Sequence, residues 1–369
     1  MCIADNAYDP DVRAKRLVIS SAVINGYKCL VFEDDGSGMT ADKLLKMLSF
    51  SFGFSEKEDV ADHKAIGQYG NGFKSGSMRL GKDVLVFTRE AASNTGSVGF
   101  LSRTYLQAVA ADNVLVPIVS WQFHRGDNSP SVLIGDETSI EANLKAITDH
   151  SPFTSPAMLE EALVTADRRR TSFFGTKIVI FNLSADLGVE VEGADIINQT
   201  AQSHEPQHRQ SLRQYLSILY LRPRMSIILL GKKVITKLVE KSLRRTKIDS
   251  YSPQPEPEQQ MQMGWKEREQ WVRRHTVRVK FGYTREEDDY GMMMYHKNRL
   301  IKGYFKVGAQ NRPQTQIGIC VMGVVDVDYL QPVHNKQDFK STKLSQKLET
   351  NLGYKLQDYW NETQQGTAP

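Results

Sequence analysis

The chain has 369 residues, of which 40% are apolar and 24% are charged, a composition typical of a globular protein with room for two domains. A formal net charge of +4 is a mild excess and only weak evidence for a nucleic-acid partner. Three cysteines without paired spacing argue against a disulfide framework or a zinc finger, and no run suggests a membrane span or a signal peptide, so we expect an intracellular protein.

A short helix and a strand pair open the chain. Residues 1–6 are typical of the second half of a helix. Residues 16–20 and 28–32 predict two strands, because Asn25-Gly26 between them is a strong signal for a hairpin turn.

The second strand leads directly into an acid and two glycines, Asp34, Gly36 and Gly38. An acid at a strand end can present its carboxylate to the exocyclic amine of a base while the glycines turn the backbone away. Thr40 then follows as the expected cap of a helix that runs to Leu48. The polar residues 56–64 suit a mobile loop over a ligand, although an ordinary solvated loop would have the same composition.

The segment 65–81, AIGQYGNGFKSGSMRLG, is the most glycine-dense part of the chain. Closely spaced glycines leave backbone N–H groups free to form a nest for phosphate oxygens. A helix is expected to begin at Gly72, with its positive end facing the same anion, and Lys74 adds a charge. The GxxxxGK[ST] spacing of a P-loop is absent from this segment.

Three further strands are expected at 82–89, 98–104 and 114–123, before a mainly helical stretch at 136–166. Phe174-Gly175-Thr176-Lys177 then opens a strand at 178–183.

Composition shifts near residues 184–201, where a second domain is expected to begin. The H-E-x-x-H spacing from His204 to His208 imitates a zinc-protease helix, but Pro206 would break that helix, so we favour an exposed linker. The expected elements are a helix at 211–221, strands at 225–230, 276–283, 290–295, 300–306 and 317–327, and a helix at 344–360. Residues 250–264 are expected to form a flexible Pro/Gln-rich loop, and Met292–294 to fill the core.

The order of these motifs resembles that of the GHKL ATPases, the superfamily of gyrase B, heat-shock chaperones, histidine kinases and MutL. The order is Asn6, then D-x-G-x-G from Asp34, then G-x-Y-G-x-G-F-K from Gly67. A closer resemblance, to the microrchidia (MORC) ATPases of animal chromatin, lies in DNAYDPDV, MLSF, YGNGFKSGSMRLGKD, YHKNRLIKGY and HNKQDF. It runs from Cys2 to about Trp360.

The resemblance implies an α/β fold in two domains. Residues 1–186 would form a Bergerat-type GHKL ATPase α/β sandwich, truncated at its N-terminus. Residues 187–369 would form a transducer domain like that of gyrase B and MutL.

The resemblance also implies a site for ATP and Mg²⁺. Asn6 would hold Mg²⁺, Asp34 would bind the adenine amine, and Lys74 would neutralise phosphate charge. Lys336, in the second domain, matches the lysine that transducer domains extend to the γ-phosphate. The remaining nucleotide-binding positions are Asp9, Gly36, Gly38, Met39, Gly67, Tyr69, Gly70, Asn71, Gly72, Phe73 and Thr176.

Cys2 departs from the family pattern. In GHKL proteins the glutamate that activates water lies four residues before the Mg²⁺-binding asparagine, and a thiol is a poor general base. The arm with which MORC proteins embrace a dimer partner is not seen before it. Either the sequence starts late, which we favour because the other nucleotide motifs are intact, or the protein has lost catalysis.

Family resemblance implies a nuclear protein that dimerises on binding ATP, clamps DNA without sequence preference, associates with chromatin proteins rather than membranes, and acts in compaction and gene silencing. The alternative is a hydrolysis-deficient module that binds ATP and DNA, and a weaker rival is a MutL- or gyrase-like ATPase. Each basic cluster alone is typical of a solvated face, but together they favour contact with a DNA backbone. The clusters are Arg168–Arg170, Lys232–Lys233, Lys241 with Arg244, Arg245 and Lys247, and Arg273–His275.

Overall fold

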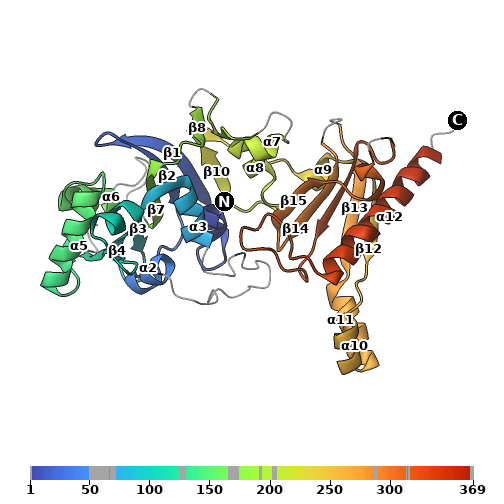
Figure 1. The fold of residues 1–369 in the computed structure, drawn as a ribbon, viewed down its shortest axis with the longest axis horizontal. Helices are drawn as coiled ribbons and strands as arrows, with labels where there is room; N and C mark the ends of the chain where they lie inside the picture. Colours follow the sequence, from blue (N-terminus) through green and yellow to red (C-terminus); the bar gives the residue numbers. More distant parts are fainter. Residues whose placement is uncertain are drawn as a thin grey trace. The chain divides into compact units, whose positions relative to one another are not determined.

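The computed structural model describes residues 2–49, 66, 72–124, 130–164, 174–190, 193–201, 206–285, 289–312, 314 and 316–365. The chain divides into two compact units (Figure 1). Unit 1 is Met1–Leu216 with Arg224–Ile235, and unit 2 is Ser217–Pro223 with Thr236–Pro369. Within the described ranges, no helix combines the length and the apolar character needed to cross a membrane.

Unit 1 is built on a nine-stranded sheet of order β11-β10-β1-β2-β7-β3-β4-β5-β6. Neighbouring strands are antiparallel except β1 and β10, which are parallel. The strands are β1 (Arg16–Ile24), β2 (Tyr27–Asp34), β3 (Gly81–Glu90), β4 (Thr95–Ser102), β5 (Ile118–Phe123), β6 (Pro130–Leu133), β7 (Gly175–Leu183), β10 (Ser226–Leu229) and β11 (Lys232–Lys233). A separate pair is formed by β8 (Leu187–Glu190) and β9 (Asp195–Asn198).

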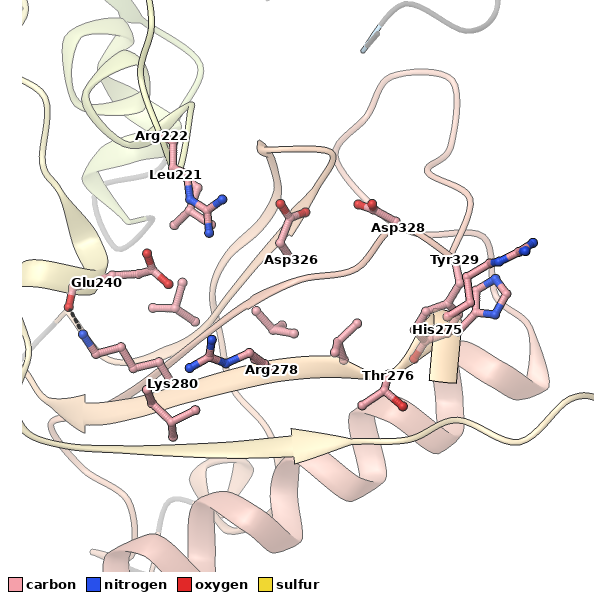
Figure 2. Close-up of a pocket in the computed structure, with 15 residues that line it drawn as sticks. Leu221, Arg222, Glu240, His275, Thr276, Arg278, Lys280, Asp326, Asp328 and Tyr329 are labelled. Carbon is pink, nitrogen blue, oxygen red and sulfur yellow. Dashed lines mark hydrogen bonds between the residues drawn. The ribbon is translucent and has the colours of Figure 1, made fainter. Parts of the chain in front are cut away.

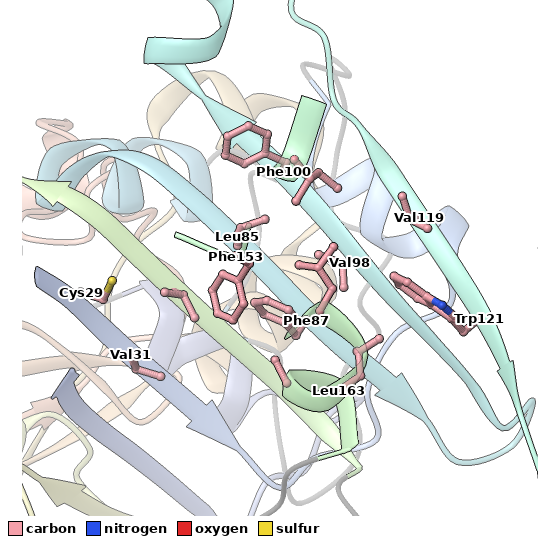
Figure 3. Close-up of a cluster of buried hydrophobic side chains, with 14 of the residues drawn as sticks. Cys29, Val31, Leu85, Phe87, Val98, Phe100, Val119, Trp121, Phe153 and Leu163 are labelled. Carbon is pink, nitrogen blue, oxygen red and sulfur yellow. The ribbon is translucent and has the colours of Figure 1, made fainter. Parts of the chain in front are cut away.

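Helices cover both faces of the large sheet. Those that contact its strands are α2 (Ala41–Leu48), α3 (Gly72–Leu80), α4 (Arg103–Ala108), α5 (Glu137–His150) and α6 (Pro156–Val164). The other helices of this part of the chain are α1 (Cys2–Tyr8), which contacts α3, α7 (Gln207–Gln210), which contacts β9, and α8 (Leu212–Ile218). Gly99 in β4 faces Leu44 and Leu48 of α2. Its neighbours Val98 and Phe100 point the other way, into a buried cluster that includes residues of α5 and α6 (Figure 3). This alternation follows from the two-residue period of a strand.

The expected start of unit 1 is confirmed. β1 and β2 pair through the Asn25-Gly26 turn, in which both residues have positive φ, 45° and 82°, as a type I′ hairpin turn requires. Thr40 caps α2 by accepting a hydrogen bond from the Lys43 N–H at 3.4 Å. α3 begins at Gly72 as predicted.

Several sequence-based boundaries are corrected. The strand expected at 98–104 ends at Ser102, whose hydroxyl caps α4, and the strand expected from residue 114 begins only at Ile118. The strand expected at 225–230 does form, as β10, but it pairs with β1 and so belongs to unit 1.

Unit 2 is a five-stranded sheet of order β12-β13-β16-β14-β15, packed on the long helix α12 (Figure 1). Leu348, Leu352 and Leu356 of α12 are fully buried against the sheet. Met292, Met293 and Met294 are also fully buried, which confirms their expected place in the core. The elements are α9 (Val239–Ser242), β12 (Arg244–Tyr251), α10 (Pro257–Gln262), α11 (Trp265–His275), β13 (Val277–Tyr283), β14 (Gly291–His296), β15 (Arg299–Phe305), η1 (Gly308–Asn311), β16 (Val321–Asp326) and α12 (Lys343–Gln365).

The segment between β12 and β13 differs from expectation. The flexible loop predicted at 250–264 is wrong for 250–251, the end of β12, and for 257–262, which form α10. The helix α11 follows without having been predicted. Gly264 is the N-cap of α11, and its N–H donates to the Glu267 carboxylate at 2.9 Å. Its eleven residues are mostly charged, so the sequence shows little apolar periodicity there.

A pocket of about 430 Å³ lies in unit 2 (Figure 2). Glu240 and Lys280 lie at one end, where the Lys280 ammonium donates to the Glu240 carbonyl at 2.7 Å, and His275 and Tyr329 lie at the other. Charges of both signs line it. Of the described residues predicted to bind nucleotide, none lines this pocket.

Candidate nucleotide site

The structure places Asp34 at the last position of β2, with its side chain buried. Its carboxylate accepts a hydrogen bond from the Gly36 N–H at 2.9 Å. Burial raises the Asp34 pKa from 3.8 to about 7, the Gly36 and Thr176 N–H groups oppose that rise, and the like charge of Asp35 adds to it. A ligand group that donates a hydrogen bond to a carboxylate in this buried position would stabilise its ionised form.

The two glycines after Asp34 occupy positions with no space for a side chain. A Cβ on Gly36 would lie 2.3 Å from the Val12 side chain. Gly38 has φ of 71°, and a Cβ there would lie 2.0 Å from the Arg89 carbonyl oxygen. Both the conformation and the close approach of backbone therefore require glycine at Gly38.

Thr176 lies beside Asp34. It pairs with Asp34 across β2 and β7, and with Thr88 across β7 and β3. The Thr88 hydroxyl accepts a hydrogen bond from the Met39 N–H at 2.8 Å, which ties the turn after Asp34 to the centre of the sheet. The predicted residues Asp34, Gly36, Gly38, Met39 and Thr176 thus form one contiguous group.

Thr88 also belongs to this group, and the sequence analysis did not name it. It is buried in β3, and its hydroxyl also donates to the Gly175 carbonyl at 3.3 Å. Its place in the group depends on strand pairing between distant segments, and a single threonine in an apolar strand gives no signal of that.

A second group comes from α1 and α3. Cys2 and Gly72 are close, since a Cβ on Gly72 would lie 3.0 Å from the Cys2 sulfur. Asn6 is half-buried one helical turn after Cys2. Asp9 is fully buried, and its carboxylate accepts a hydrogen bond from the Ile66 N–H at 2.6 Å. Asp9 therefore fixes the backbone at Ile66, near the start of the glycine-rich segment 65–81.

The two groups meet at the turn after α1. The Ser37 N–H donates to the Val12 carbonyl at 3.1 Å, and Val12 also packs against Gly36. The segment after Asp34 and the segment after α1 are thus joined by a backbone hydrogen bond between residues that flank the two groups.

Lys74 is buried in α3, with Phe73 beside it in the core. The Lys74 ammonium donates to the Ser49 carbonyl at the end of α2, at 2.5 Å. Burial lowers the Lys74 pKa. Its predicted role at phosphate stays a prediction.

Part of the predicted site lies outside the described residues. This applies to Gly67, Tyr69, Gly70 and Asn71, the centre of the expected phosphate nest. His204 and Glu205 also lie outside them. In the ranges that the structure describes, no group of three His, Cys, Asp or Glu side chains could hold a metal ion.

Lys336 belongs to unit 2, in a turn between β16 and α12. It is buried and has a positive φ of 54°. Its carbonyl accepts a hydrogen bond from the Arg299 guanidinium at 2.6 Å.

The expected basic clusters are partly exposed. Lys232, Lys233, Arg273 and Arg274 are exposed, and so is Trp265, at 71%. Exposed members of the Lys241 cluster are Lys241, Arg244, Arg245 and Lys247, of which Lys247 forms an ion pair with Glu362. Arg168–Arg170 lie outside the described residues.

Two family models match this chain. Residues 2–133 match the family described as "Histidine kinase-, DNA gyrase B-, and HSP90-like ATPase", and residues 210–360 match "Morc6 ribosomal protein S5 domain 2-like". The two matches fall on the segments expected to hold the GHKL ATPase and the transducer domain, and they confirm the expected α/β fold class.

Relatives match over nearly the whole chain. The mouse protein "MORC family CW-type zinc finger protein 3" is 44% identical over 98% of this chain and 37% of its own length. "Protein MICRORCHIDIA 6" of Arabidopsis thaliana is 32% identical over 97% of this chain and 54% of its own length. This chain therefore spans between about a third and about half of these two relatives. Among solved structures, the ATPase region of Saccharomyces cerevisiae topoisomerase II aligns with a TM-score of 0.42 and 11% identity, over 91% of this chain and 75% of that one.

Proposed function

The chain belongs to the MORC family of GHKL-type ATPases, and from that premise we propose that unit 1 binds ATP with Mg²⁺ in a chromatin-associated protein. The observation that carries the proposal is the buried Asp34 carboxyl at the end of β2. It is fixed by the Gly36 N–H and surrounded by backbone that leaves no space for side chains.

The chemistry of the residues around Asp34 supports the recognition of adenine. The exocyclic amine of adenine donates hydrogen bonds, and a buried carboxylate is a strong acceptor for it. Burial disfavours the ionised form of Asp34 in the free protein. The adenine amine would donate a hydrogen bond to the carboxylate and so stabilise its ionised form. Thr176 pairs with Asp34 across the sheet, and the Thr88 hydroxyl accepts the Met39 N–H in the turn after Asp34.

The residues of α1 fit a magnesium–phosphate group. Mg²⁺ takes oxygen ligands and is often held by one protein side chain together with substrate phosphates. Asn6 is half-buried and offers one amide oxygen, whereas Asp9 already accepts the Ile66 N–H. Asn6 would thus hold the ion, while Gly72 and Lys74 would lie on the phosphate side. The cofactor would supply charge neutralisation for the phosphates.

Asp34→Asn tests the proposal, because it keeps the shape of the side chain but replaces the charged acceptor. We expect ATP binding by the variant to be undetectable in calorimetry, while its circular dichroism spectrum matches that of the parent. Asp35→Asn is the matched control. Its carboxylate accepts the Lys15 and Arg16 N–H groups at 2.7 and 2.8 Å, so it should retain ATP affinity. Unchanged affinity in Asp34→Asn would remove Asp34 from the adenine site.

The second candidate function is a module that binds ATP without hydrolysing it. Cys2 favours this reading. It stands where the family pattern has the general-base glutamate, it lies beside Gly72, and a thiol is a poor general base.

Cys2→Glu distinguishes the two candidates. General-base help is worth about 10²–10⁴ in rate, so steady-state turnover should rise by that order in Cys2→Glu. Cys2→Gln has a similar shape but no base, and should stay at the level of the parent. If the parent already turns over as fast as Cys2→Glu, the non-hydrolysing candidate is eliminated.

The wider role is proposed from the family. ATP would promote formation of a homodimer that clamps DNA in the nucleus, in association with chromatin proteins and with chromatin compaction and gene silencing as the outcome. The exposed cations of β11, β12 and α11 suit contact with phosphates, and such binding is independent of sequence and weakened by salt.

A further inference from the structure

The pocket of unit 2 lies on the face of the sheet opposite α12 (Figure 2). In β13, Val277, Val279 and Phe281 point into the core that packs on α12. The residues between them, Arg278 and Lys280, therefore point to the opposite face, because successive side chains of a strand alternate. Both line the pocket, whose volume of about 430 Å³ lies within the range of pockets that hold small ligands.

The cations of this pocket have donors to offer. Arg274 and Arg278 both line it and are exposed. Within the ranges that the structure describes, their guanidinium groups form neither a hydrogen bond nor an ion pair. Lys280 uses one of its three N–H donors on the Glu240 carbonyl at 2.7 Å. The face of β13 and the end of α11 thus bring three cations to one pocket.

The acids of the pocket contact a different part of unit 2. The Asp326 carboxylate accepts the Asn298 N–H at 3.0 Å, and the Asp328 carboxylate accepts the Lys297 N–H at 3.2 Å. Both acids are therefore used by the turn between β14 and β15. Neither forms an ion pair with Arg278, although all three residues line the same pocket.

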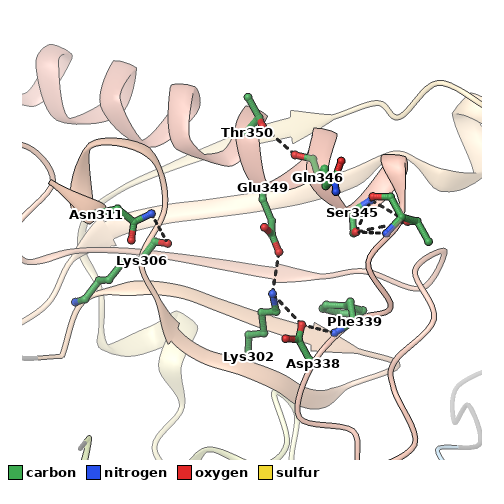
Figure 4. Close-up of polar contacts among 10 residues, drawn as sticks. Lys302, Lys306, Asn311, Asp338, Phe339, Ser345, Gln346, Glu349 and Thr350 are labelled. Atoms are coloured by element: carbon green, nitrogen blue, oxygen red, sulfur yellow. Dashed lines mark hydrogen bonds and ion pairs between the residues drawn. The ribbon is translucent and has the colours of Figure 1, made fainter. Parts of the chain in front are cut away.

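Lys302 shows how unit 2 pairs a cation from within. Its ammonium lies between the Asp338 and Glu349 carboxylates, at 2.9 and 2.8 Å (Figure 4). The protein itself supplies the anions there. The arginines of the pocket receive no such partner from the described residues, so an external anion can take that place.

Tyr329 adds a neutral donor to the pocket. Its hydroxyl is shielded from solvent and has no hydrogen-bond partner among the residues that the structure describes. Burial raises the Tyr329 pKa, and the nearby Tyr251 adds to the rise, so the hydroxyl keeps its proton at neutral pH. The ring meets that of His275 edge-on, with 5.9 Å between the ring centres, which helps to fix its position. A bound acceptor would supply the missing partner.

We propose that this pocket binds a small molecule that carries two or more oxyanion charges, held by Arg274, Arg278 and Lys280 with the Tyr329 hydroxyl. All four groups donate hydrogen bonds, and a guanidinium can pair with a phosphate or a carboxylate through two parallel ones. The site goes beyond the proposed ATP site, since none of the described residues of that site lines it.

The charges around the pocket favour a compact anion over a nucleic-acid backbone. Asp328 lines the pocket and is exposed, so an extended polyanion passing over it would be repelled. A small anion avoids that repulsion by lying over β13, where the cations are.

Amide hydrogen exchange of residues 274–280 and 326–330 in the full chain tests the proposal. This measurement is specific to the pocket, so an anion bound in unit 1 does not contribute to it. Pyrophosphate and citrate are the two probes, added without Mg²⁺. We expect at least one of them to slow exchange in both segments, with a concentration dependence that gives its dissociation constant. Protection by only one probe identifies the ligand as a phosphate or a carboxylate.

Three variants locate the anion. Arg278→Gln should raise the dissociation constant by about tenfold or more, because hydrogen bonds to charged groups contribute that much. Tyr329→Phe removes only the hydroxyl and should raise the constant by about fivefold. Arg273→Gln is the matched control: Arg273 is exposed in α11 beside Arg274 but does not line the pocket, so binding should not change.

Several results would overturn the proposal. One is exchange that neither probe slows. Another is an equal loss of binding in Arg273→Gln and Arg278→Gln, which would mean diffuse attraction to a positive surface rather than a site. Protection by a short DNA duplex at lower concentrations than by either small anion would assign the pocket to nucleic acid instead. Unchanged binding in Tyr329→Phe would remove the hydroxyl from the site.

Discussion

At the scale of single residues, the ionisation of Asp34 affects the stability of the folded protein and, in the proposed site, the binding of ATP. Its pKa of about 7 in the folded protein lies above the ordinary value of 3.8, chiefly because the carboxyl is buried. An acid whose pKa is raised by folding stabilises the protein fully below the ordinary pKa, and that contribution is lost as pH rises through 7. From the two pKa values, the loss amounts to roughly 4 kcal/mol at most. The proposed adenine acceptor is thus a charge that weakens the protein when no nucleotide is bound.

This gives a pH-dependent prediction. Asp34→Asn cannot ionise, so without nucleotide its melting temperature should rise relative to the parent between pH 5 and pH 8. Added ATP should stabilise only the parent, because ligand that binds the folded state shifts unfolding by mass action. The measurement is thermal unfolding across that pH range. Asp35→Asn is the control: it removes only the smaller, charge-based contribution to the raised Asp34 pKa and leaves the burial, so it should keep most of the parent's pH dependence. A difference between parent and Asp34→Asn that stays constant with pH would contradict the raised pKa.

Residue types and spacing were enough to predict Asp34, Gly36 and Gly38 as a group, because the D-x-G-x-G pattern is local. The reasons for those residues are visible only in the fold. Gly38 is needed because the Arg89 carbonyl, fifty-one residues later, lies where its side chain would be. Lys74 looked like a free cation in the sequence, and its ammonium instead donates to Ser49. Which atoms a polar group meets depends on packing between segments that are far apart in the chain.

At the scale of elements, turn residues in the sequence correctly predicted the hairpin that they form. Asn25-Gly26 fixed the β1–β2 hairpin because both residues accept positive φ, and Lys297-Asn298 plays the same part between β14 and β15, with φ of 49° and 74°. Prediction failed where stability comes from outside the segment. α11 carries mainly charged residues, and its N-cap is Gly264, which has no side chain that could signal a helix start; the Glu267 carboxylate accepts the Gly264 N–H instead.

At the scale of the whole molecule, the chain enters unit 2 twice. Residues Ser217–Pro223 belong to unit 2, Arg224–Ile235 return to unit 1, and Thr236 begins the rest of unit 2. The return exists because β10 pairs in parallel with β1, and parallel pairing joins segments about two hundred residues apart. A single domain boundary placed where the composition changes, as at residue 186, cannot reveal that the chain passes into unit 2, returns to unit 1 and enters unit 2 again. The expected division into 1–186 and 187–369 stays a prediction about family domains.

This connectivity bears on how ATP would act. The proposed adenine residues belong to unit 1, and Lys336 belongs to unit 2. If one nucleotide contacts both, ATP must bias their relative orientation, because a ligand shifts a conformational equilibrium only through contacts that differ between the states. ADP has no γ-phosphate, so it should bind unit 1 without that bias. The predicted clamp therefore depends on one phosphate and one lysine.

The last prediction separates a clamp from a static ATP-binding module. Lys336→Ala should keep much of its nucleotide affinity, which Asp34 and the glycine turns supply, but lose the response to the γ-phosphate. Sedimentation velocity should show a faster-sedimenting, dimeric species for the parent with a non-hydrolysable ATP analogue. ADP should leave the parent unchanged, and the analogue should leave Lys336→Ala unchanged. Lys340→Ala is the matched control: Lys340 follows the same turn, and its ammonium donates to the Gln331 side chain at 3.0 Å, so the parent's response should remain. Sedimentation that is indifferent to both the γ-phosphate and Lys336 would mean that ATP does not couple the two units, and the clamp would have to be abandoned.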